Sequence, residues 1–149
     1  MPRKPQRGLP KKSTVLQLRK DVYAQLKDLQ SDFKSFSQLI EVMTFWVHDL
    51  YAEEGIMIVY TLRDIARPKK NGIESLTAKA ETRRAHVTID QEAIAFLKML
   101  SMRYPQAFPG PSQAANACAL YVLQHCRDFN AKKHLLRRLE QVRNKHLGS

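Results

Sequence analysis

The chain has 149 residues, of which 44% are hydrophobic, enough for one or two small domains with a modest core. Its 25 Lys and Arg against 14 Asp and Glu give a net charge of +11, which favours a polyanionic partner such as nucleic acid or an anionic membrane surface. The sequence has no glycine-rich phosphate loop, no metal-ligand spacing and no recognisable catalytic triad motif, so we expect neither an enzyme nor a bound cofactor or metal.

The first 12 residues form a basic arm. Its basic residues are Arg3, Lys4, Arg7, Lys11 and Lys12, and no acidic residue occurs before Asp21. We expect the arm to be disordered alone and to follow phosphates when nucleic acid is bound. No apolar stretch follows the arm and no run approaches the roughly 20 residues of a membrane span, so we expect a cytoplasmic, nucleoid-associated protein without such a span.

The residues after the arm change their hydrophobic period near residue 19. Thr14, Leu16 and Leu18 alternate with polar or smaller neighbours, a pattern typical of a short strand with one buried face. Apolar residues then recur at helical spacing over residues 22–33 and predict a helix. Because a lone strand leaves its backbone groups unpaired, the pattern also predicts a partner strand.

A second helix is predicted to begin within the sequence SFSQ. Ser35 occupies its N-cap and Gln38 follows three residues later, the arrangement of a capping box. We expect Gly55 to end this helix. The connection that follows contains IMIVYTL, which has strand composition, and RPKKNG, a charged turn, and we assign this connection no role.

The second half of the chain repeats this pattern. A shift of 71 positions places Leu16 on Val87, and every apolar position of the strand and first helix keeps its character. After the longer connection RYPQAFPGP the shift becomes 75, which places Trp46 on Tyr121, so we expect both aromatic residues in the core. The repeat therefore predicts the missing strand.

The helices of the second half carry their own start signals. Asp90 is a predicted N-cap for the first of them, whereas the matching residue in the first half is Arg19. Gly110 is the predicted cap of the second, with Pro111 at the first helical position, where its missing N–H costs nothing.

The last predicted element is a basic helix at the C-terminus. It places Leu135, Leu139 and Val142 on one face, which favours packing on the body with a solvated basic face. Contact of this helix with a membrane surface or nucleic acid is the alternative interpretation. The predicted organisation is thus arm 1–12, first unit 13–51, connection 52–82, second unit 83–128 and C-terminal helix 129–149.

A strand, helix, helix unit that pairs through its strand resembles the ribbon-helix-helix family of DNA-binding proteins, the class of the Arc and MetJ repressors. The resemblance rests on the strands STVLQLR and RAHVTID and on the helices SFSQLIEV and PSQAANAC, and the two units cover about two thirds of the chain. It implies an α+β fold, mainly α: a tandem pseudo-dimer with a two-stranded antiparallel ribbon, four main helices and the C-terminal helix. Tandem units in one chain are similar to TraY-type proteins.

The resemblance implies two sets of DNA contacts. The ribbon would enter the major groove and contact bases with the outward residues Ser13, Val15, Gln17, Arg84, His86 and Thr88. Arg84 suits guanine, Gln17 suits adenine and Val15 suits a thymine methyl group. Phosphates would be contacted by the arm residues Arg3, Lys4, Arg7, Lys11 and Lys12 and by the helix starts at Ser35, Ser37, Gly110 and Ser112.

We therefore expect a sequence-specific double-stranded DNA-binding protein that acts as a transcriptional repressor. Two alternatives share this DNA-binding ribbon: an accessory protein of conjugative or plasmid DNA transfer with a relaxase partner, and an antitoxin with a toxin partner. A third alternative, an RNA or anionic-membrane binder that uses charge only, predicts no preference among duplex sequences. Further self-association on DNA also stays open.

Overall fold

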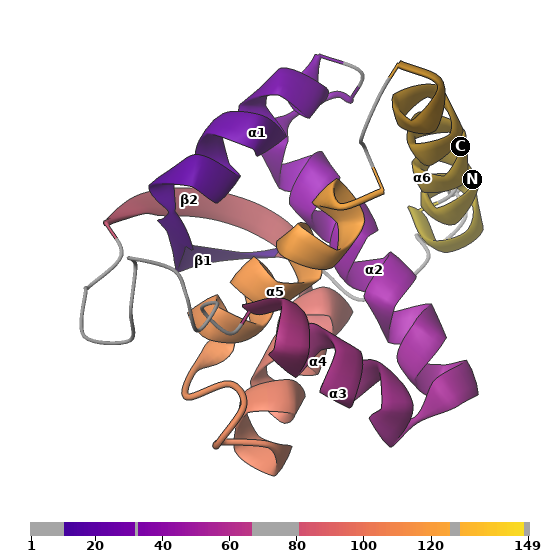
Figure 1. Cartoon of the computed structure of the whole chain (residues 1–149). Coiled ribbons are helices and arrows are strands. Elements are labelled where there is room, and N and C mark those ends of the chain that lie inside the picture. The colour runs from indigo at the N-terminus through magenta and orange to yellow at the C-terminus, as the bar shows by residue number, and fades with distance from the viewer. Residues whose placement is uncertain (1–10, 32, 67–80, 126–128, 148–149) are drawn as a thin grey trace, which may run out of the picture.

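The computed structural model describes residues 11–31, 33–66, 81–125 and 129–147, so Arg3, Lys4 and Arg7 of the arm lie outside the described residues. The elements are β1 (Lys11–Arg19), α1 (Lys20–Gln30), α2 (Phe36–Glu54), α3 (Ile56–Ala66), β2 (Thr82–Asp90), α4 (Gln91–Arg103), α5 (Pro111–Leu123) and α6 (Phe129–Leu147). Within these residues the fold is α+β and mainly helical, with one two-stranded antiparallel sheet (Figure 1), as the sequence predicts.

Strands β1 and β2 pair along their whole length. Lys11 lies opposite Asp90 at one end of this ribbon and Arg19 lies opposite Thr82 at the other. One face is buried against the helices and consists of Leu16, Leu18, Ala85, Val87 and Ile89. This alternation follows from the two-residue period of a strand, and the partner strand predicted from the repeat is confirmed as β2.

The helices α2 and α5 form the centre of the core beneath the ribbon (Figure 1). Helix α2 packs on β2 and α5 packs on β1, and the two helices also pack on each other. On α5 the buried residues include Ala114, Ala115, Ala117 and Ala119. Their small side chains let α5 contact β1, α3 and α4 closely at the same time.

Helix α3 lies in the connection to which the sequence assigned no role, and it adds to the four main helices and the C-terminal helix that were expected. The stretch IMIVYTL, which has strand composition, is helical from Ile56 onward. Ile58, Val59 and Leu62 recur at helical spacing and are buried, on the helix that packs on α2 and α5. Burial of this stripe outweighs the small helix penalty of β-branched residues, which amounts to a few tenths of a kcal/mol each. Gly55, with φ of 61°, ends α2 as predicted.

The predicted helix caps are confirmed, with one change of detail. The Ser35 Oγ accepts a hydrogen bond from the Gln38 backbone N–H at 3.1 Å. The Gln38 side-chain oxygen accepts from the Lys34 N–H rather than from the Ser35 N–H of a standard capping box. Asp90 caps α4 by accepting from the Glu92 N–H at 2.8 Å. Gly110 is the N-cap of α5 and Pro111 follows it.

Helix α6 packs along α2 (Figure 1), and its predicted apolar face is buried. Leu135, Leu139 and Val142 are all at most 5% exposed. The expectation that this helix packs on the body is therefore confirmed. None of the described helices is both long and apolar enough to cross a membrane.

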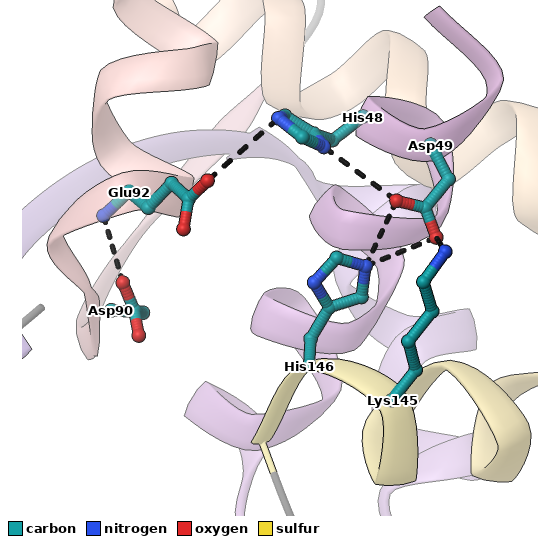
Figure 2. Close-up of polar contacts among 6 residues, drawn as sticks. All are labelled: His48, Asp49, Asp90, Glu92, Lys145 and His146. Atoms are coloured by element: carbon teal, nitrogen blue, oxygen red, sulfur yellow. Dashed lines mark hydrogen bonds and ion pairs between the residues drawn. The ribbon is translucent and has the colours of Figure 1, made fainter. Parts of the chain in front are cut away.

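A polar cluster joins the end of α6 to α2 (Figure 2). The His146 Nε2 lies 2.8 Å from the Asp49 Oδ1, and the Lys145 ammonium lies 3.3 Å from the Asp49 Oδ2. The His48 Nδ1 lies 3.6 Å from the same carboxylate. Burial alone would raise the pKa of Asp49, but the hydrogen bond from His146 and the charge of Lys145 outweigh it and lower that pKa.

Candidate nucleic-acid interface

The outer face of the ribbon presents all six residues expected to contact bases. Ser13, Val15, Gln17, Arg84, His86 and Thr88 are each exposed, and the residues that alternate with them in the middle of the strands are buried or partly covered. Val15 is 37% exposed, although it is a large apolar residue. The period of the strands thus separates a packed face from a face that is free to meet a ligand.

Three cross-strand pairs make up this face. Ser13 lies opposite Thr88 and their hydroxyl oxygens are 3.2 Å apart. Val15 lies opposite His86, and Gln17 lies opposite Arg84. One end of the face therefore carries two short hydroxyl side chains, and the other carries two long hydrogen-bonding side chains.

The Gln17 and Arg84 end is the more versatile donor and acceptor surface. The Gln17 Oε1 accepts a hydrogen bond from the Thr82 hydroxyl at 3.2 Å, which restrains the amide. Arg84 forms no ion pair within the described parts of the chain, so its guanidinium is available. The neighbouring Arg83 instead lies over the Tyr23 ring, with its guanidinium carbon 4.6 Å from the ring centre.

Two serines that were expected to contact phosphate hold the ribbon in place. The Ser37 Oγ accepts a hydrogen bond from the Thr88 N–H at 3.0 Å, and the Ser112 Oγ accepts from the Gln17 N–H at 2.8 Å. The second helix of each repeat thus binds the strand of the other repeat. Each serine oxygen accepts one hydrogen bond in this way, and its hydroxyl group can still donate one. A phosphate contact by the same side chain therefore stays a prediction.

Two buried polar residues that the sequence did not single out also bind the helices to the ribbon. The Asn116 Oδ1 accepts from the Arg19 N–H at 2.9 Å, and its Nδ2 donates to the Gln17 carbonyl at 2.9 Å. At the matching position on α2, the Glu41 Oε2 accepts from the Asp90 N–H, and Glu41 is only 2% exposed. The repeat holds the signal that would have found them, because its shift of 75 aligns Glu41 with Asn116 inside two apolar helices.

The remaining phosphate candidates are differently placed. The Lys11 ammonium contacts the buried Glu41 carboxylate, which offsets its charge. Lys12 is exposed and forms no ion pair among the described residues. Ser35 is exposed and Gly110 is half-buried, at the starts of α2 and α5. The structure brings these helix starts to the ribbon, because Ser37 and Ser112 in the first turns bind its strands.

No family model, curated protein or solved structure matches the chain. The described residues also contain no group of three His, Cys, Asp or Glu side chains arranged to hold a metal ion. The function is therefore inferred from the geometry and chemistry of the ribbon.

Proposed function

We propose that the chain is a sequence-specific double-stranded DNA-binding protein of the ribbon-helix-helix kind that acts as a transcriptional repressor. The observation that carries this proposal is the β1–β2 ribbon, which packs one face on the helices and leaves six side chains exposed on the other. A protein with net charge +11 would bring this face to a polyanion with favourable electrostatics.

The dimensions of the ribbon suit the major groove of DNA. Two paired strands are about 5 Å apart, and with their side chains they fit a groove about 12 Å wide. All four base pairs present different donor and acceptor patterns in that groove. We assign Arg84 to guanine, Gln17 to adenine and Val15 to a thymine methyl group, since these side chains match the patterns.

A tandem pseudo-dimer is the architecture that we propose for this reader. The hydrogen bond from the Gln17 N–H to Ser112 and the one from the Thr88 N–H to Ser37 are equivalent under the sequence repeat. Such paired contacts support two units related by a local twofold axis within one chain. Symmetric relatives of this design need two chains to complete a ribbon, whereas here one chain supplies both strands.

Contacts to phosphate would flank the ribbon on both sides. The free backbone N–H groups at the starts of α2 and α5 and the positive ends of the helix dipoles suit an anion. Ser35 and Gly110 stand at these two starts. Lys12, which the structure places in β1, and the arm residues before β1 would add non-specific attraction, which weakens as salt rises.

Selection of bound duplexes from a random pool tests the proposal. We expect one recurrent, non-palindromic element, and an unselected pool after several rounds would overturn sequence-specific binding. The variant Arg84→Ala would remove the side chain that we assign to guanine. Its matched control is Lys98→Ala, because Lys98 is an exposed cation on α4 and not on the ribbon. An element beside the protein's own gene would favour repression. An element at a transfer origin would favour the accessory role instead.

A further inference from the structure

Three exposed large hydrophobic residues of the described chain lie on one helix away from the ribbon. They are Ile56, Met57 and Tyr60 on α3, exposed by 45%, 60% and 44%. The residues of α3 that are buried are Ile58, Val59 and Leu62, so the exposed three lie on the opposite side of a short helix. Apolar side chains clustered in this way indicate an interaction surface.

A pocket adjoins the exposed side of α3 and is basic. It has a volume of about 480 Å³ and is lined by Tyr60, Arg63, Arg103, Tyr104 and Pro105, among others. The Arg63 guanidinium lies over the Tyr60 ring and contacts Asp64 at 3.2 Å. Arg103 is exposed and has no ion-pair partner in the parts of the chain that the structure describes. The C-terminal end of α3 thus lies beside the Arg103 guanidinium, which no described acidic residue neutralises.

The N-terminal end of α3 is acidic. Glu53 and Glu54 close α2 immediately before Gly55 and α3, and both are exposed. Neither forms an ion pair with another described residue. Along the direction of α3, the exposed side chains therefore run from acidic through apolar to basic. Helix α3 has 11 residues, so this sequence of charges spans about 16 Å at 1.5 Å per residue.

This order of charges is self-complementary. When two copies of such a helix lie antiparallel across a twofold axis, the acidic end of each meets the basic end of the other. The apolar centre then meets its own copy and is removed from water. With a net charge of +11, two copies repel each other in general, so a face with paired opposite charges is where they can meet.

We propose that the surface formed by Glu53, Glu54, Ile56, Met57, Tyr60, Arg63 and Arg103, the α3 surface, binds a second copy of this chain. Helix α5 packs on β1 and on α3, so the α3 surface and the outer face of the ribbon belong to different sides of the core. A dimer formed in this way would carry two separate ribbons and could bind two neighbouring elements. The inference does not depend on the proposed DNA binding.

Sedimentation equilibrium of the full chain without DNA tests this dimer. Between about 1 μM and about 1 mM, the range in which modest interfaces assemble, we expect a monomer–dimer equilibrium. The variant Met57→Glu should sediment as a monomer. Val15→Ser, which changes the exposed large apolar residue of the ribbon, should leave the equilibrium unchanged. A wild-type chain that stays monomeric over this whole concentration range would overturn the proposal. The α3 surface would then bind a different protein.

A charge exchange identifies the interface. The all-basic variant Glu53→Arg with Glu54→Arg and the all-acidic variant Arg63→Glu with Arg103→Glu should each lose association by at least tenfold. An equimolar mixture of the two should recover a heterodimer, because opposite charges then meet at both ends. All these positions are at least partly exposed, so the variants should retain the wild-type circular dichroism. Association of either variant alone, or a mixture that stays monomeric, would overturn the α3 interface.

Discussion

Val15 lies directly opposite His86 in the ribbon, and the shift of 71 positions in the sequence repeat relates the same two residues. A local twofold axis between them would therefore exchange β1 with β2. It would also exchange the Ser13–Thr88 pair with the Gln17–Arg84 pair. Because these pairs differ in chemistry, the backbone of the ribbon is compatible with twofold symmetry while its outer face is not.

The asymmetry of the outer face predicts an asymmetric DNA site. The Met57→Glu variant, chosen to exclude association through α3, should bind a minimal duplex with one chain per duplex. Titration of the duplex, monitored by sedimentation, gives this ratio. A palindromic site occupied by two chains that exchange strands would contradict the single-chain ribbon.

Base recognition predicts different outcomes for two cations of the ribbon. Arg84→Ala should cost about 1 to 3 kcal/mol on the preferred duplex and relax specificity there. Lys12→Ala should weaken all duplexes similarly and lower the salt slope by about one. Lys12 suits this comparison better than Lys11, whose ammonium contacts Glu41. Competition binding with preferred and scrambled duplexes measures both effects. Equal losses on the two duplexes for Arg84→Ala would argue against base contact.

Asn116 should contribute to stability because its buried side chain satisfies partly buried backbone groups of the ribbon. In Asn116→Ala, the Arg19 N–H and the Gln17 carbonyl lose their partner, so we expect a loss of roughly 1 to 3 kcal/mol in the free energy of unfolding. Urea unfolding provides the measurement. Gln113→Ala changes an exposed residue of the same helix and should alter the value by about 0.5 kcal/mol or less. Similar losses for both variants would contradict this assignment.

Trp46 is a core residue, as the sequence predicts, whereas Tyr121 is only partly buried against the core. It is 6% exposed, its ring centre lies 6.0 Å from that of Tyr121, and the Arg138 guanidinium lies over it at 5.6 Å. Trp46→Ala should therefore cost on the order of 3 to 5 kcal/mol in thermal or urea unfolding. Tyr121→Phe keeps the neighbouring ring and should cost about 0.5 kcal/mol or less. An unchanged melting temperature in Trp46→Ala would show that this packing is not formed.

The cluster at Asp49 predicts a dependence of stability on acid. Its pKa is lowered in the folded protein, so its stabilising contribution is complete above the pKa of the unfolded chain, about 4. The contribution is lost as the pH falls through the lower folded pKa. Asp49→Asn should therefore be less stable than wild type at pH 7, and the difference should shrink below about pH 4.

Urea midpoints measured from pH 7 to acid would show this effect. Asp28→Asn, an exposed carboxylate on α1, is the control and should have a smaller effect at pH 7. A difference between wild type and Asp49→Asn that stays constant with pH would mean that the contacts of Asp49 with His146 and Lys145 do not stabilise the fold.

The sequence by itself determined the features that depend on near neighbours. The alternation in residues 13–18 and 84–89 assigned each side chain to the inner or outer face, because a strand has a period of two. Ser35 and Asp90 were recognisable as caps, since a cap bonds N–H groups two or three residues away. The buried face of α6 was likewise visible in its helical spacing.

Only the tertiary structure decided the conformation of IMIVYTL and the hydrogen-bond partners of Asn116 and Asp49. The β-branched residues of that stretch suit a strand or a helix, and packing of α3 on α2 and α5 selects the helix. The bonds of Asn116 to Arg19 and of His146 to Asp49 each join residues 97 positions apart. No local period or cap encodes such pairs, because they form only when packing of the apolar faces has brought distant helices and strands into contact.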